Sequence, residues 1–88
     1  MTWKVEFDPH ALKELSRLDK PAQQRILRFL RQRIENEEDP RRLGGPLHGP
    51  QKDLWKYRIG DYRLICDIQE DKVRVLVLRV GHRREVYR

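Results

Sequence analysis

The 88-residue chain carries a net charge of +6, from 20 Lys and Arg residues against 14 Asp and Glu. A chain of this length buries one small core, so we expect a single domain over residues 1–88. Its single cysteine excludes an internal disulfide and favours a reducing compartment, so we expect a cytoplasmic protein. No apolar run suits a signal peptide or spans a bilayer, so no membrane attachment is expected.

The N-terminal half predicts one strand and two helices. Apolar and charged residues alternate from Trp3 to Phe7, which is typical of a half-buried strand. Asp8 and Asp19 are each followed within two residues by a proline, and this pairing is typical of a helix start. Apolar residues then recur at helical spacing, which predicts a short helix after Asp8 and a longer one after Asp19. The two helices form a hairpin whose apolar face must pack on a flat partner.

The C-terminal half predicts a loop and a meander of three strands. Residues 40–53 hold three of the five glycines and three of the five prolines, which indicates a loop. Residues 54–59 and 62–68 flank a two-residue Gly60-Asp61 turn, and a further strand is expected within 71–80. The element order is therefore strand, helix, helix, strand, strand, strand. It predicts an α+β fold in which the helical hairpin covers one face of a mostly antiparallel sheet.

Basic side chains of the predicted hairpin share one face. Lys56 and Arg58 are two residues apart, so both project away from the face that meets the helices. Pairing across the turn puts Arg58 beside Arg63, and like charges placed opposite one another destabilise a sheet. Such a pair indicates a site that holds an anion, the alternative being solvated surface bases. Arg79 and Arg83 are expected to extend this patch if the last strand lies beside the preceding one.

The charge distribution favours a nucleic acid as the anion. Residues 41–88 contain nine Arg and three Lys against six acidic residues, and arginine suits bidentate phosphate binding. His82 can transfer a proton near neutral pH, and Tyr87 can stack on a base or donate a proton. The alternative for His82 is an exposed side chain with no role in catalysis, and the alternative for Tyr87 is a ring packed on the sheet edge. No metal-binding or nucleotide-cofactor motif occurs, so no cofactor is expected.

This residue set suits RNA cleavage by transesterification. In that reaction the 2′-OH attacks the adjacent phosphorus, cations stabilise the charge that develops on the phosphorane, and no metal is required. Lys56 is one candidate for the base that removes the 2′ proton.

Three stretches resemble the RelE/ParE superfamily of bacterial toxins: "LWKYRIGDYRL", "VGHRREVYR" and, more weakly, "FDPHALKEL". The resemblance spans essentially the whole chain. It implies a microbial-ribonuclease-like fold and a toxin that enters the ribosomal A site and cuts the translated mRNA there. It also implies a cognate RelB-like antitoxin that wraps the toxin, and contact with operator DNA only through the toxin–antitoxin complex.

The resemblance implies roles for individual residues. Binding of the mRNA backbone, stabilisation of the transition state and proton transfer fall to Lys56, Arg58, Arg63, Arg83 and Tyr87. Arg58 and His82 each stand where the best-known RelE sequence has a lysine. Because arginine stays protonated, the general base is then Lys56, His82 or Tyr87. A further expected difference from that sequence is the lack of a trailing helix after Tyr87.

Two other functions remain open at this point. A ParE-like toxin shares the fold but inhibits DNA gyrase without cleaving RNA. A non-catalytic RNA-binding module is the third interpretation. Retention of the five-residue basic and tyrosine set favours the RelE-like function over both.

Overall fold

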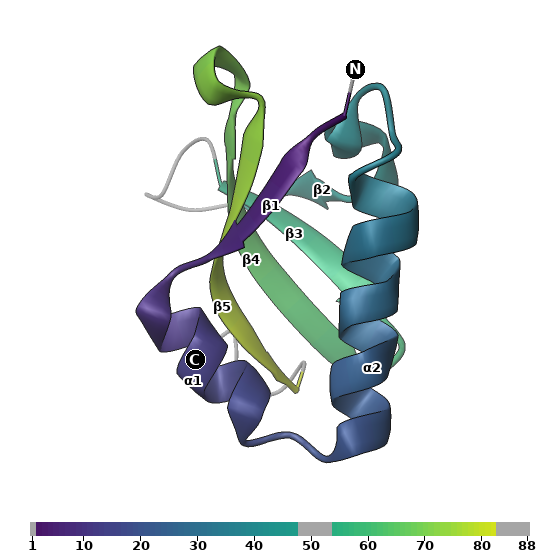
Figure 1. Ribbon diagram of the computed structural model, residues 1–88, viewed down its shortest axis with the longest axis vertical. Helices are drawn as coiled ribbons and strands as arrows, with labels where there is room; N and C mark the ends of the chain where they lie inside the picture. Colours follow the sequence, from purple (N-terminus) through teal and green to yellow (C-terminus); the bar gives the residue numbers. More distant parts are fainter. Residues whose placement is uncertain (1, 48–53, 83–88) are drawn as a thin grey trace.

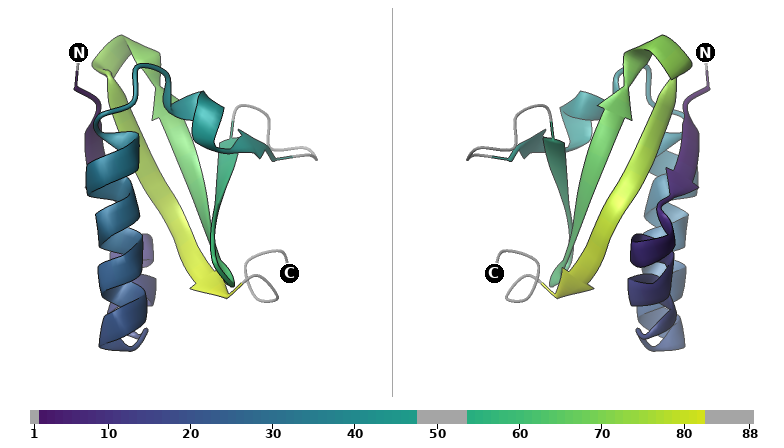
Figure 2. Two further views of the ribbon diagram at one scale, coloured as in Figure 1. Left: turned by 90° about the vertical axis from the view of Figure 1, so that its right-hand side faces the viewer. Right: turned by 90° about the vertical axis from the view of Figure 1, so that its left-hand side faces the viewer.

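The computed structural model describes residues 2–47 and 54–82, which form one five-stranded sheet and two helices (Figure 1). The strand order is β1-β5-β4-β3-β2. β1 runs parallel to β5, and the other neighbouring pairs are antiparallel. Both helices lie on one face of the sheet, so the predicted α+β architecture is confirmed (Figure 2). The strands are β1 Lys4–Phe7, β2 Gly45–Pro46, β3 Leu54–Ile59, β4 Tyr62–Gln69 and β5 Arg74–His82.

The helices begin where the capping residues predict. Helix α1 spans Pro9–Ser16 and α2 spans Lys20–Phe29. The carboxylates of Asp8 and Asp19 each accept a hydrogen bond from a backbone N–H of the first turn, at 3.1 and 3.2 Å. The second helix continues through a wider π-helical turn, η1, over Leu30–Ile34. Within the described residues, neither helix has the length and apolar character needed to cross a membrane.

The predicted loop at 40–53 is wrong in its first part. Residues Pro40–Leu43 form a 3₁₀ turn, η2, and β2 then adds to the sheet beside β3. A Cβ atom on Gly44 would collide with the carbonyl oxygen of Lys56 and lie 2.8 Å from the Tyr57 ring. Glycine therefore lets the backbone approach β3 closely, whereas in the sequence it reads as a loop signal.

The core fills the space between the helices and the sheet. Tyr57 and Ile59 of β3 contribute to this core, with exposed fractions of 0% and 6%. Cys66 is buried and free, and burial raises the pKa of its thiol. The side chains of Lys56 and Arg58 alternate with these core residues and project to the opposite face. Other core members are Trp3, Ala11, Leu15, Ile26, Leu30, Ile34, Leu64, Val75, Val77 and Val80.

Candidate functional site

The β3–β4 hairpin brings three basic residues together on the sheet face away from the helices. Arg58 pairs with Arg63 across the Gly60-Asp61 turn, as the sequence predicts. Lys56 lies two residues earlier on β3, opposite Ile65 of β4. Arg58 is exposed, whereas Lys56 and Arg63 are half-buried. Adjacent rigid strands therefore hold three cations in a fixed arrangement.

These cations line a pocket of about 400 Å³. Tyr57 also lines it, and a second wall is the segment from the end of η2 to β2, beside β3, which contributes Leu43, Gly44 and Gly45. The described lining contains no carboxylate, and neither Arg58 nor Arg63 has an ion-pair partner among the described residues. A pocket with this lining is suited to bind an anion such as phosphate.

The turn at the tip of the hairpin packs against a further arginine. Gly60 has a left-handed backbone with φ of 59°, and a Cβ added there would lie 2.8 Å from Nη1 of Arg25 on α2. Arg63 Nη1 donates to the carbonyl oxygens of Gly60, at 3.4 Å, and Tyr62, at 3.1 Å. The hairpin tip thus has arginines from both the helix and the sheet. Sequence reasoning missed Arg25, because its position off the apolar stripe of α2 marks it only as exposed.

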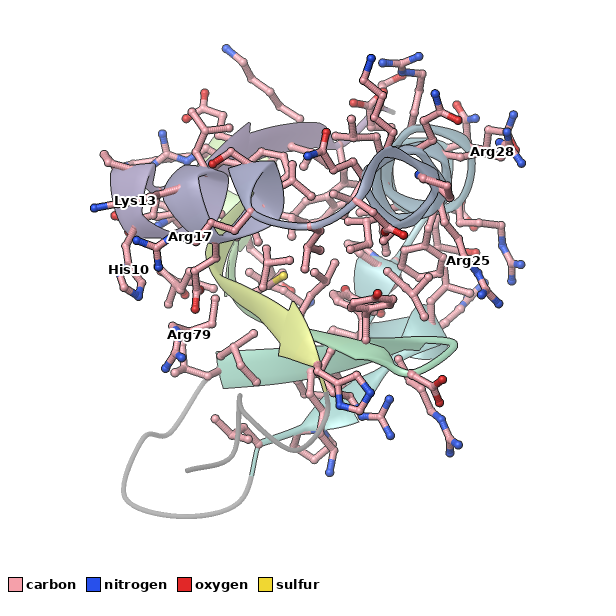
Figure 3. All side chains as sticks on the ribbon, turned by 90° about the horizontal axis from the view of Figure 1, so that it is seen from below. His10, Lys13, Arg17, Arg25, Arg28 and Arg79 are labelled. Carbon is pink, nitrogen blue, oxygen red and sulfur yellow. The ribbon has the colours of Figure 1, made fainter. Side chains whose placement is uncertain are left out.

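Arg79 does not line this pocket and, unlike Arg58 and Arg63, has an acidic partner among the described residues. It pairs with Ile65 on β4, as the predicted strand order requires, but its Nε lies 3.2 Å from Glu14 Oε1 on α1. Figure 3 shows Arg79 on the α1 side of the molecule. Arg79 thus lies in one cross-strand row with Lys56 and Ile65 while its guanidinium pairs with Glu14, and its part in the basic patch stays a prediction. A register shift between Ile65 and Cys66, typical of a β-bulge, changes how β5 presents its side chains here.

The described part of the chain ends beside the cluster. Gly81 pairs with Arg63, and His82 pairs with Tyr62 at the end of β5. The rings of His82 and Tyr62 meet edge to face with centroids 6.0 Å apart. Arg83 and Tyr87 lie outside the described residues, so their place in the site stays a prediction. Among the described residues, no three His, Cys, Asp or Glu side chains group in a way that suits a metal ion.

Comparison with known proteins places the chain in a family. The model of the family described as the ParE toxin of the type II toxin–antitoxin system, parDE, matches residues 5–87. The chain belongs to the RelE/ParE superfamily. The predicted resemblance is thereby confirmed, and the protein is the toxin component of a type II toxin–antitoxin system.

The similar proteins lie on the RelE side of the superfamily. Toxin RelG of Mycobacterium tuberculosis is 31% identical over 88 residues, covering 100% of this chain and 99% of the relative. The mRNA interferase toxin RelE of Escherichia coli is 34% identical over 90 residues, covering 99% and 92%. The toxin–antitoxin complex RelBE2 from M. tuberculosis contains a chain that matches with a TM-score of 0.86 and 29% identity, covering 94% of this chain and 100% of that chain.

In this RelE-like toxin, the side chain of Glu14 pairs with the edge of β5 where β1 no longer does. β1 pairs only as far as Val77, and beyond it Glu14 Oε1 accepts a hydrogen bond from the backbone N–H of Val80 at 2.9 Å. The carboxylate also holds Arg79, and it lies 3.8 Å from Nε2 of His10. Helix α1 thus fixes the strand end that leads into Gly81 and His82. Sequence reasoning missed this contact, which spans 66 residues.

We expect Glu14→Ala to lower the free energy of unfolding by about 1–3 kcal/mol, because it leaves a part-buried N–H without its charged acceptor. Urea denaturation measures the change. Glu6→Ala is the matched control, since Glu6 also pairs with an arginine of β5, Arg74, at 3.0 Å, but through side chains only. That control is expected to cost less than about 1 kcal/mol. Equal losses in the two variants would contradict a special role for the bond to Val80.

Proposed function

We propose that this toxin is an mRNA endoribonuclease that cleaves translated messages in the ribosomal A site by 2′-OH transesterification, without a metal ion. The observation that carries the proposal is the pocket where Lys56, Arg58 and Arg63 converge in a lining that, within the described residues, holds no carboxylate. The E. coli relative, named an mRNA interferase toxin, supports the same reaction class at 34% identity.

The mechanism divides among the residues by their chemistry. Arg58 and Arg63 are cationic side chains on paired strands, so they are preorganised to stabilise the negative charge that grows on the phosphorane oxygens. Lys56, His82 or Tyr87 removes the 2′ proton, and an acid then protonates the departing 5′ oxygen. The resemblance assigns Arg83 to the phosphate and Tyr87 to stacking or proton transfer.

The partners follow from the same assignment. The similar solved structure from M. tuberculosis, RelBE2, is that of a toxin–antitoxin complex. We propose a cognate RelB-like antitoxin for this chain, which contacts operator DNA only within the toxin–antitoxin complex. The ribosome and its bound mRNA are the proposed targets, which makes the cytoplasm the site of action.

Primer extension on a translated message tests the proposal. We expect 5′ ends within codons when purified toxin, message and translating ribosomes are combined, and intact message when ribosomes are omitted. Cleavage without ribosomes would contradict ribosome dependence.

Inhibition of DNA gyrase is the second candidate function, because the description of the matching family model names the ParE toxin. Intact message under both conditions, together with blocked DNA supercoiling by gyrase, would favour that function instead.

A further inference from the structure

The two walls of the pocket differ in chemistry. One wall carries the cations of β3 and β4, and the other is Leu43, which is half-buried and packs partly on the core, with the backbone of Gly44 and Gly45. This second wall, the Leu43–Gly45 wall, presents an apolar side chain and flat peptide groups within reach of the cationic groups. A phosphate joined to a flat, weakly polar group matches both walls at once, and a nucleotide is such a molecule.

The Leu43–Gly45 wall is anchored before any ligand arrives. The buried Tyr57 hydroxyl donates to the carbonyl oxygen of Pro40 at 2.8 Å, and Trp55 Nε1 donates to that of Arg41 at 3.2 Å. Arg41 Nη1 also lies 2.7 Å from a carboxylate oxygen of Glu70, beyond the end of β4. Bonds from β3 and beyond β4 thus fix η2, and the pocket of about 400 Å³ falls within the about 300–1,000 Å³ usual for small-molecule sites.

The two glycines of the wall differ in what they do. Packing requires Gly44, because a Cβ there would collide with the backbone of β3. Packing does not require Gly45. The nearest described atom to a Cβ placed there is Lys56 Cε at 4.0 Å, and its φ is not left-handed. With respect to the described residues, Gly45 nevertheless leaves open space beside the side chain of Lys56, its partner across the β2–β3 pair.

We propose that the Leu43–Gly45 wall is a nucleobase subsite, and that the open space at Gly45 receives the base of the nucleotide whose phosphate contacts Arg58 and Arg63. This inference rests on the proposed ribonuclease function and adds to it the surface that sets base preference at the cut. The wall contacts the base and not the reacting phosphate, so altering it changes which sequence is cut more than it changes the chemistry.

Gly45→Val tests the subsite by placing a branched side chain in the open space. In the ribosome assay with a message that samples many codons, we expect an altered base distribution at the mapped 5′ ends and at least about 10-fold less cleavage at the sites the wild type prefers. Pro46→Val is the matched control, because it changes the next residue of β2, which does not line the pocket. A cut-site distribution that is the same in Gly45→Val and wild type would overturn the inference.

Binding of small ligands to the free toxin gives a second, independent readout. The four nucleoside 3′-monophosphates and inorganic phosphate are titrated while the backbone amide signals of residues 43–45 are followed by NMR. We expect the nucleotides to bind wild type more tightly than phosphate does, and Gly45→Val to abolish the difference. Equal affinity of wild type for nucleotide and phosphate would overturn the subsite. A wild type that prefers nucleotides but cuts no message supports the subsite and overturns the proposed function.

Discussion

Replacing Arg58 by glutamine is expected to lower ribosome-dependent mRNA cleavage by about 10²–10³-fold. Arg58 projects from β3 into the pocket, where a fixed positive charge stabilises the phosphorane more than it stabilises the substrate. Glutamine keeps hydrogen-bonding capacity but removes the charge. The free energy of unfolding is expected to stay within about 0.5 kcal/mol, because Arg58 is exposed and makes no ion pair with the described residues.

Single-turnover cleavage on programmed ribosomes measures this effect apart from product release. Arg28→Gln is the matched control: Arg28 is also exposed, has no ion pair among the described residues and lies on α2, so its replacement removes the same charge away from the pocket. Arg58→Lys retains the charge and is expected to keep most of the rate. An equal loss in Arg28→Gln would show that the toxin uses total charge, and would contradict a catalytic role for Arg58.

The basic cluster was predictable because its geometry is local. A two-residue turn at Gly60-Asp61 fixes the register of the hairpin, and strand alternation then assigns each side chain to a face. Arg58 and Arg63 therefore become neighbours from a stretch of only six residues. The helix starts were predictable for the same reason, since Asp8 and Asp19 cap backbone groups within three residues of themselves.

Contacts between distant segments were not predictable from these local rules. The parallel pairing of β1 with β5 joins the two ends of the described chain, and no local pattern distinguishes it from other pairings. Glu14 reads as a polar residue of an amphipathic helix, yet it meets Arg79 and Val80 from 65 and 66 residues away. The same ion pair gives Arg79 an acidic partner that strand alternation does not indicate.

The pocket wall was not predictable from the sequence, because a glycine can indicate either a loop or a close backbone contact. In the sequence, Gly44 and Gly45 beside prolines indicate a loop, and the segment does connect a helix to a strand. In the structure, Gly44 is needed for close approach to β3, and only three-dimensional packing separates that role from flexibility. The positions of Arg83 and Tyr87 still rest on the resemblance, because they lie outside the described residues.

Tyr57→Ala is expected to lower the free energy of unfolding by about 3–5 kcal/mol, the range for deleting a buried aromatic side chain. The Tyr57 ring is fully buried and packs against Phe29 with centroids 5.8 Å apart. Its hydroxyl also holds Pro40, so the variant removes an anchor of the pocket wall as well as core volume. Urea denaturation followed by circular dichroism measures the loss, which is a large part of the about 5–15 kcal/mol typical of small domains.

Two further variants separate the ring from its hydroxyl. Tyr57→Phe keeps the ring and leaves the Pro40 carbonyl without its donor, so a loss of about 1 kcal/mol is expected. Tyr62→Phe is the matched control, because Tyr62 is only half-buried and no hydrogen bond of its hydroxyl occurs among the described residues. It is expected to change stability by less than about 0.5 kcal/mol. A loss in Tyr57→Phe as large as in Tyr57→Ala would assign the stabilisation to the hydrogen bond instead of to ring burial.

The pH dependence of stability provides a second test of the Tyr57 hydroxyl. Burial, with a smaller contribution from the neighbouring Cys66, raises the pKa of Tyr57 above its ordinary value. The folded state therefore holds this proton more tightly than the unfolded state, in which tyrosine titrates near pH ~10. The contribution of the Tyr57 proton to stability is complete below that pH and is lost as the pH rises further.

The Tyr57→Phe variant has no such proton. The difference in unfolding free energy between this variant and wild type is therefore expected to narrow between pH 8 and 11 in urea unfolding series. Cys66, whose pKa is also raised, is present in both proteins, so the comparison isolates the proton of Tyr57 together with its coupling to Cys66. A deficit that stays constant over this range would contradict a buried, protonated Tyr57.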